Sequence, residues 1–108
     1  MAALLHPARE QFDLVDVLAA LGHPVRMKIV QALASGAETY CGAIETGAPK
    51  STLTHHWRVL RESGVIRLRH EGRRNYLTLR RDDLEARFPG LLAVVLGGDA
   101  GSSFPEAG

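Results

Sequence analysis

The stretch PKSTLTHHWRVLRESGVIRLRHEGRRNYLTL, residues 49–79, carries the clearest structural pattern in the chain. Leu53, Trp57 and Leu60 lie at positions i, i+4 and i+7, so they share one face of a helix. Gly64 follows the last residue of this pattern and can end the helix in the left-handed conformation. The opposite face carries short hydrogen-bonding side chains. The pattern predicts a helix with an apolar back and a polar front, ending at this glycine.

A hairpin is predicted directly after this helix. In residues 65–70, apolar side chains alternate with arginines, which indicates a half-buried strand. Residues 71–74, EGRR, are typical of a turn, and residues 76–79 supply the return strand. We therefore expect a hairpin that carries Arg73 and Arg74 at its tip.

Two helical patterns precede this region. Residues 9–21 carry two apolar series that cover more than one face of a helix. The surplus indicates that part of this helix packs outside its own core, either on a second copy of the chain or, alternatively, against a second element of the same chain. Pro24 suits the first position of the next helix, His23 can cap it, and Gly36 can end it.

The remaining patterns are weaker. Residues 40–46 can form a short helix, although Gly42 disfavours it. The last apolar series, residues 84–95, keeps helical phase across Pro89 and Gly90, which predicts two short helices or one kinked helix. The whole order predicts a mainly α fold with a β-hairpin wing.

Length and composition indicate a single globular domain. The chain has 108 residues, of which 45% are hydrophobic. We expect a flexible leader at residues 1–8, a folded domain at residues 9–96 and a disordered tail at residues 97–108. No apolar run approaches the roughly 18 residues that a membrane span needs. The single cysteine excludes an internal disulfide framework, and we expect a cytoplasmic protein.

The charge is unevenly distributed. The whole chain has 13 Lys and Arg against 12 Asp and Glu, a formal net charge of +1. Residues 50–81 hold nine basic and two acidic residues, a net charge of +7, and the remainder carries −6. This basic block coincides with the predicted helix and hairpin. It indicates that these two elements bind a polyanion.

The two elements fit double-stranded DNA in shape as well as in charge. A helix about 10 Å across enters the major groove, and a two-stranded loop beside it can reach the phosphates or the minor groove. The predicted order is that of a winged helix-turn-helix. The helix-turn-helix would span residues 40–63, with residues 47–49 as the turn.

Three segments resemble the ArsR/SmtB family of bacterial winged-helix repressors: LGHPVRMKIVQALASG at residues 21–36, STLTHHWRVLRESGVI at residues 51–66 and EGRRNYLTL at residues 71–79. The resemblance covers roughly residues 10–96. It implies a homodimer that binds a palindromic operator. It also implies a repressor that is released by a metal ion or another signal. The apolar patterns of the first and last helices independently indicate that these two helices supply the dimer surface.

The resemblance assigns a DNA-binding role to nine residues. Five occupy positions that face bases in the family: Lys50, Ser51, Thr52, Thr54 and His55. Two are placed nearer the phosphates, His56 and Arg58, and two lie at the tip of the wing, Arg73 and Arg74.

The metal-binding patterns of the family are absent from this sequence. Where metal-sensing members carry Cys-x-Cys, this chain has Tyr40, Cys41 and Gly42, and residues 82–85 supply acidic side chains but no histidine. A thiophilic site needs three or four soft or imidazole ligands. We expect no metal and no cofactor. Cys41 is either a redox-sensing thiol or a small buried side chain.

The sequence thus predicts a homodimeric DNA-binding transcriptional regulator of the repressor type. The alternative is a winged-helix module that binds an acidic protein, which would need apolar or aromatic anchors on the helix front. Trp57 is the only candidate anchor, and its helical phase places it in the core. No nucleophile, base and orienting group are arranged in evident relation, so we expect no enzyme.

Overall fold

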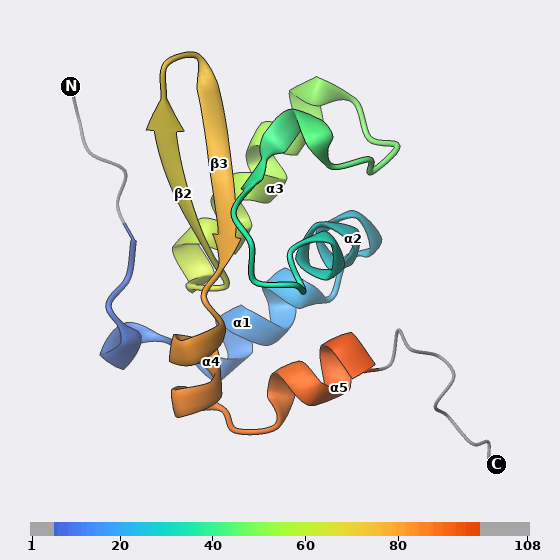
Figure 1. The fold of residues 1–108 in the computed structure, drawn as a ribbon. Coiled ribbons are helices and arrows are strands. Elements are labelled where there is room, and N and C mark those ends of the chain that lie inside the picture. The colour runs from blue at the N-terminus through green and yellow to red at the C-terminus, as the bar shows by residue number, and fades with distance from the viewer. Residues whose placement is uncertain (1–5, 98–108) are drawn as a thin grey trace, which may run out of the picture.

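The computed structural model describes residues 6–97, which form helices and a three-stranded sheet (Figure 1). The elements are η1 (Arg9–Gln11), α1 (Leu14–Leu21), α2 (Pro24–Ala32), β1 (Thr39–Tyr40), η2 (Cys41–Ala43), α3 (Lys50–Ser63), β2 (Ile66–Glu71), β3 (Arg74–Leu79), α4 (Arg81–Arg87) and α5 (Leu91–Gly97). The predicted tail lies outside the described residues except for Gly97, which ends α5. The predicted mainly α fold with a hairpin wing is confirmed.

The wing is the antiparallel pair β2–β3, in register from Ile66 opposite Leu79 to Glu71 opposite Arg74. Gly72 has a positive φ of 62° at the tip, which lets the chain reverse within the turn. Figure 1 shows the hairpin beside α3, with α4 and α5 at the far end of the molecule from its tip. The wing thus leaves its tip exposed.

The helix α3 forms where the apolar spacing predicts it. Leu60 is fully buried, and Trp57 is 9% exposed. Gly64 ends the helix with a φ of 95°. The N–H of Val65 donates to the carbonyl of Leu60 at 2.9 Å, and the N–H of Gly64 donates to the carbonyl of Arg61 at 3.1 Å. This pattern satisfies carbonyls that a helix end leaves open.

The first helix is shorter than predicted. The helix α1 begins at Leu14 instead of Arg9, because the Asp13 carboxylate accepts a hydrogen bond from the N–H of Val15 at 2.8 Å and so caps the helix. Phe12 has extended backbone and is buried, 4% exposed. From His6 onward, a single 3₁₀ turn, η1, is the only helical element before Phe12.

The second helix begins as predicted and ends earlier. Pro24 opens α2, and Nδ1 of His23 accepts a hydrogen bond from the N–H of Val25 at 3.1 Å. The helix ends at Ala32, and the chain continues in turns to Gly36, whose φ is 89°. The predicted left-handed glycine is therefore present, four residues beyond the end of the helix.

The predicted short helix at residues 40–46 is wrong. Thr39 and Tyr40 form the strand β1, which pairs with β3 so that Tyr40 lies opposite Tyr76. Only a 3₁₀ turn, η2, follows this strand. The first helix expected for the helix-turn-helix is thus reduced to one turn, because the residues before it pair with the wing.

For the last apolar series we expect either two short helices or one kinked helix, and the series forms two short helices, α4 and α5. The chain leaves helical geometry at Phe88, before Pro89, and Gly90 has a φ of 90°. Leu84 and Leu92 belong to the core. Among residues 6–97, no helix is long and apolar enough to cross a membrane.

Candidate nucleic-acid interface

The front of α3 is exposed and polar. Its apolar back packs in the core, which fixes the rotation of the helix and turns the predicted base-facing side chains to solvent. The exposed members of the predicted set on this helix are Lys50, Ser51, Thr52, Thr54, His55 and Arg58. We call these six residues the α3 face. They combine hydrogen-bonding groups with two long cations, a composition that suits a groove lined by base edges and phosphates.

One side chain of the α3 face already has a local partner. The hydroxyl of Thr52 donates to the carbonyl of Pro49 at 2.9 Å. Because a hydroxyl has one hydrogen and two lone pairs, Thr52 can still accept a hydrogen bond. Pro49 itself provides no side-chain cap.

The wing presents two arginines in different ways. Arg73 and Arg74 are both exposed, but the guanidinium of Arg74 lies 4.3 Å from the centre of the Tyr40 ring. A guanidinium over an aromatic face is held by the electrons of the ring. Sequence reasoning missed this contact, because it depends on the pairing of β1 with β3.

The middle of the wing is tied to the segment before β1. Nε and Nη2 of Arg69 donate to the two carboxylate oxygens of Glu38 at 2.8 and 2.7 Å. Arg69 also pairs with Glu71 and lies 4.7 Å from the centre of the Tyr76 ring. The hydrogen bond from Arg69 lowers the pKa of Glu38 below its ordinary value. The forked geometry orients the strand that carries the wing arginines.

His56 is not part of the α3 face. It is buried, 7% exposed, and its ring centre lies 4.6 Å from that of His23. Nη1 of Arg26 lies 3.1 Å from Nδ1 of His56, and an arginine can only donate, so Nδ1 is the acceptor. Arg26 also donates to the carbonyls of Ala19 and Ala20 at the end of α1. The structure therefore buries His56 where it joins α1, α2 and α3.

The environment of His56 disfavours its charged form. Burial lowers its pKa, and the nearby His23, Arg26 and His55 lower it further. The ring is thus held neutral by its surroundings. A neutral ring keeps the lone pair that accepts from Arg26.

Cys41 is half-buried beside the start of α3. It lines a pocket of about 250 Å³ with Lys50, Leu53, Thr54 and Trp57. Burial raises the pKa of the Cys41 thiol to about 11, whereas a redox-sensing thiol needs a lowered pKa. The raised pKa therefore favours the second of the two expected roles of Cys41, that of a small buried side chain. Within residues 6–97, no three or more His, Cys, Asp or Glu side chains are grouped to hold a metal ion.

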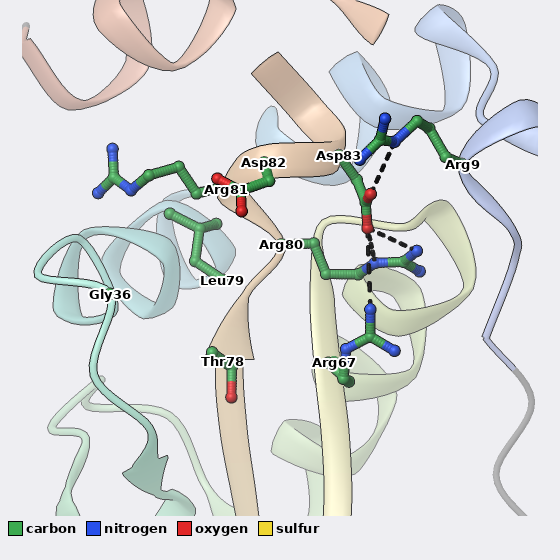
Figure 2. Close-up of a pocket in the computed structure, with 9 residues that line it drawn as sticks. All are labelled: Arg9, Gly36, Arg67, Thr78, Leu79, Arg80, Arg81, Asp82 and Asp83. Carbon is green, nitrogen blue, oxygen red and sulfur yellow. Dashed lines mark hydrogen bonds and ion pairs between the residues drawn. The ribbon is translucent and has the colours of Figure 1, made fainter. Parts of the chain in front are cut away.

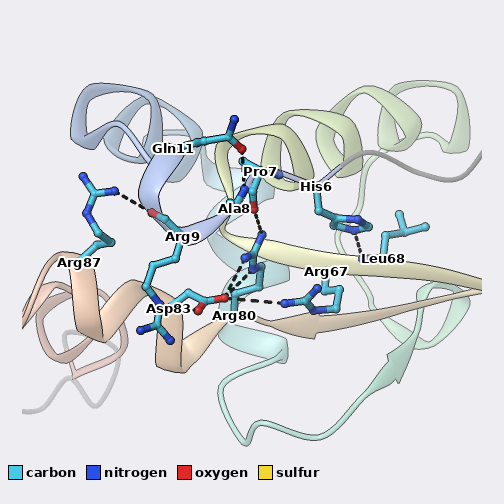
Figure 3. A network of polar contacts seen from close by, with 10 residues as sticks. All are labelled: His6, Pro7, Ala8, Arg9, Gln11, Arg67, Leu68, Arg80, Asp83 and Arg87. Carbon is cyan, nitrogen blue, oxygen red and sulfur yellow. Dashed lines mark hydrogen bonds and ion pairs between the residues drawn. The ribbon is translucent and has the colours of Figure 1, made fainter.

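Residues 6–11, which we call the N-terminal strap, are bound to the wing and to α4 (Figure 3). Nε2 of His6 accepts from the N–H of Leu68 on β2 at 3.0 Å. The carbonyl of Pro7 accepts from Arg80 at 2.8 Å, and the carbonyl of Arg9 accepts from Arg87 at 2.7 Å. The last residues of the predicted leader are thus fastened to the domain.

Asp83 is the centre of this polar network. It accepts from Arg9 at 2.8 Å and from Arg80 at 2.9 Å. Burial alone would raise the pKa of Asp83, but the hydrogen bonds from Arg9 and Arg80 outweigh it and hold the pKa below its usual value. The network connects the strap, the base of the wing and α4.

The sequence matches a family model and a curated protein. A model described as a helix-turn-helix domain matches residues 21–69. The chain is 33% identical over 83 residues to the uncharacterized HTH-type transcriptional regulator YceK of Bacillus subtilis, an alignment that covers 74% of this chain and 83% of YceK. Both matches include α3, whose exposed face is described above.

Solved structures share the fold. The homodimeric winged helix-turn-helix DNA-binding domain of Mb0332 from Mycobacterium bovis, a possible ArsR-family regulator, superposes with a TM-score of 0.63 at 27% identity, covering 87% of each chain. The transcriptional repressor BigR from Xylella fastidiosa superposes with a TM-score of 0.58 at 28% identity, covering 76% of this chain and 84% of BigR. Because it has the wing, the exposed α3 face and these relatives, the chain belongs to the ArsR family of DNA-binding winged helix-turn-helix transcriptional regulators.

Proposed function

We propose that the protein is a homodimeric repressor that binds a palindromic operator and is released by a signal that is still to be identified. The observation that carries this proposal is the exposed α3 face, set on a helix whose opposite side is buried in the core. The family and the fold are those of DNA-binding transcriptional regulators, which are not enzymes. We therefore expect no catalytic activity, and we expect the protein to act in the cytoplasm.

The α3 face divides into two roles in this proposal. Lys50 and the short side chains of the α3 face read base edges in the major groove, since hydroxyl, imidazole and ammonium groups match the donors and acceptors there. Arg58 neutralises backbone phosphates. Arg73 and Arg74 extend the charged contact from the wing tip, where the hairpin leaves them exposed.

An exposed apolar surface supports the dimer. Large hydrophobic side chains that remain exposed among the described residues are Leu14, Val15, Leu18, Tyr40 and Val94. Three of them lie on α1 and one lies on α5, the two helices expected to pair. We call the α1 and α5 members the apolar patch. A second copy of the chain would remove this surface from water.

Dimer symmetry leads to the palindrome. A two-fold axis between two copies presents two α3 faces in opposite directions, so each reads the same half-site on one strand or the other. The Mb0332 domain is described as homodimeric, and BigR is described as a repressor. These descriptions support the same assembly and role for this chain.

The proposal is tested by titrating the protein against the DNA that flanks its own coding region in a mobility-shift assay. We expect affinity to fall about a thousandfold or more between 50 and 200 mM salt, as several phosphate contacts require. A control duplex of unrelated sequence should bind more weakly at every salt concentration. Absence of salt-sensitive binding to any duplex would refute the proposal.

A further inference from the structure

A basic pocket lies at the base of the wing, away from the wing tip (Figure 2). Its volume is about 450 Å³, within the range of small-molecule sites. It is bounded by the N-terminal strap, β2, β3, the start of α4 and the turn after α2. The lining residues are Arg9, Gly36, Arg67, Thr78, Leu79, Arg80, Arg81, Asp82 and Asp83.

The lining carries more positive than negative charge. Four arginines and two aspartates give it a formal charge of +2. A concave surface of one sign concentrates the electric field and attracts the opposite charge. The pocket therefore favours an anion that carries two charges.

The carboxylate of Asp83 is already used by two of the arginines. Oδ1 accepts from Nε of Arg9 at 2.8 Å. Oδ2 accepts from Nε of Arg80 at 2.9 Å, and Nη2 of Arg80 lies 2.8 Å from the same oxygen. The side chain of Arg80 is only 5% exposed, so the ion pair of Arg80 and Asp83 forms the buried side of the pocket.

Of the two other arginines, Arg81 donates to the carbonyl of Ala34, and Arg67 makes a longer ion pair with Asp83. Its Nη2 lies 3.8 Å from Oδ2 of Asp83, beyond hydrogen-bond distance, and its side chain is 55% exposed. Thr78 lies directly opposite Arg67 in the register of β2 and β3, so the two side chains share one face of the hairpin. Both residues line the pocket, and Figure 2 shows them on neighbouring strands, with the guanidinium of Arg67 turned toward Asp83.

We propose that this pocket binds a small metabolite through a dianionic oxygen group, either a phosphate or a pair of carboxylates. Arg67 supplies the forked donor, Thr78 supplies a hydroxyl donor, and Arg9 adds charge from the strap. A guanidinium fork matches both carboxylate and phosphate geometry. Binding of the anion to the free protein does not depend on the proposed function. An effect of the anion on operator binding does rest on the proposed function.

The binding test uses the full-length protein without DNA. Inorganic phosphate and succinate are titrated separately by calorimetry at constant ionic strength near neutral pH, with sodium chloride as the balancing salt. We expect at least one of them to bind saturably with a dissociation constant below about 10 mM, as one well-paired dianion requires. Backbone amide shifts in NMR spectra should change at Arg67 and Thr78.

Two charge-matched variants decide whether the site is specific. Arg67→Gln should weaken binding about tenfold, the loss expected for one charge-assisted pair. Arg73→Gln removes the same charge from the tip of the same hairpin and should leave the affinity unchanged. Equal losses in both variants, shift changes confined to the wing tip, or no saturable binding of either probe would overturn the proposal.

The two probes also separate the sources of the anion. Binding of phosphate alone assigns a phosphorylated ligand, and binding of succinate alone assigns a dicarboxylate. A third arm measures operator affinity of Arg67→Gln with neither probe present. If this variant loses operator affinity and its salt dependence weakens by about one phosphate contact, the pocket holds the DNA backbone, and the small-ligand assignment is overturned.

Discussion

The ring of Phe12 lies directly over the α-carbon of Gly64, so a methyl group on that glycine would overlap three atoms of the ring. Phe12 comes from the segment before α1, and Gly64 ends α3. The glycine is thus required twice, once by its φ of 95° and once by the ring that covers it. This contact joins the N-terminal segment to the helix that carries the α3 face.

We expect Gly64→Ala to be strongly destabilising. The left-handed conformation costs an alanine about 1–2 kcal/mol, and the overlap with Phe12 adds about 1–3 kcal/mol. The free energy of unfolding should therefore fall by about 2–5 kcal/mol in urea denaturation. Gly36→Ala is the matched control, because its φ is 89° and nothing lies within 4 Å of the added carbon. Equal losses in the two variants would show that the contact with Phe12 adds no penalty.

The helix α3 and the wing could be predicted because their signals are local. The apolar spacing of Leu53, Trp57 and Leu60, the glycine at residue 64 and the alternation of residues 65–70 each act within a few residues. The structure has the helix and both strands within one or two residues of those expectations.

The misassigned segments depend on partners far away in the sequence. Tyr40 forms a strand because β3 lies beside it, and no local pattern announces that partner. Phe12 continued an apolar series with helical spacing, although Asp13, a preferred cap residue, follows it and marks the true start. That signal was present in the sequence and went unused.

The structure leaves eight of the nine predicted DNA-binding residues exposed and buries His56. Its spacing of three residues from Leu53 and four from Leu60 places it beside the apolar back of α3, so helical phase alone favours burial. The resemblance to the family instead placed His56 nearer the phosphates, on the exposed side of the helix. The partner Arg26 could not be foreseen, because it comes from the packing of α2 on α3.

The buried His56 predicts a pH dependence of stability. Its pKa is lowered in the folded protein, mainly by burial, while the unfolded chain has an ordinary pKa near about 6.5. The unfolded state therefore gains a proton first, and the free energy of unfolding should fall as pH drops below about 6.5. Urea denaturation at about pH 7.5 and 5.5 measures this loss.

The matched variants are His56→Asn and His70→Asn. Asparagine at position 56 keeps an acceptor for Arg26 but cannot titrate, so this variant should lose less stability than the wild type between the two pH values. His70 is exposed on β2, and its variant should behave as the wild type does. Glu38 and Asp83 have lowered pKa values and contribute at lower pH. An unchanged pH response in His56→Asn would contradict the prediction.

The apolar patch predicts the oligomeric state. Leu18 on α1 is 48% exposed, and Leu18→Glu should place a charge inside the proposed dimer interface. We expect the dimer dissociation constant to rise about a hundredfold or more in sedimentation equilibrium, while far-ultraviolet circular dichroism stays unchanged. Lys28→Glu, at an exposed position of α2, is the control for an added negative charge. A dimer of unchanged strength in Leu18→Glu would place the interface elsewhere.

The roles of the wing and of the α3 face can be separated by their different dependence on sequence and salt. Arg73→Ala removes a proposed phosphate contact, so affinity should fall by a similar factor on every duplex, and the slope of log affinity against log salt should weaken by about 0.9. Thr54→Ala removes a proposed base contact, so it should lower affinity for the operator about five- to hundredfold and leave unrelated duplexes nearly unaffected. Lys28→Ala, which removes an exposed cation outside both surfaces, should change neither quantity. If Thr54→Ala weakens all duplexes equally, Thr54 contacts only the backbone, and specificity must come from other residues.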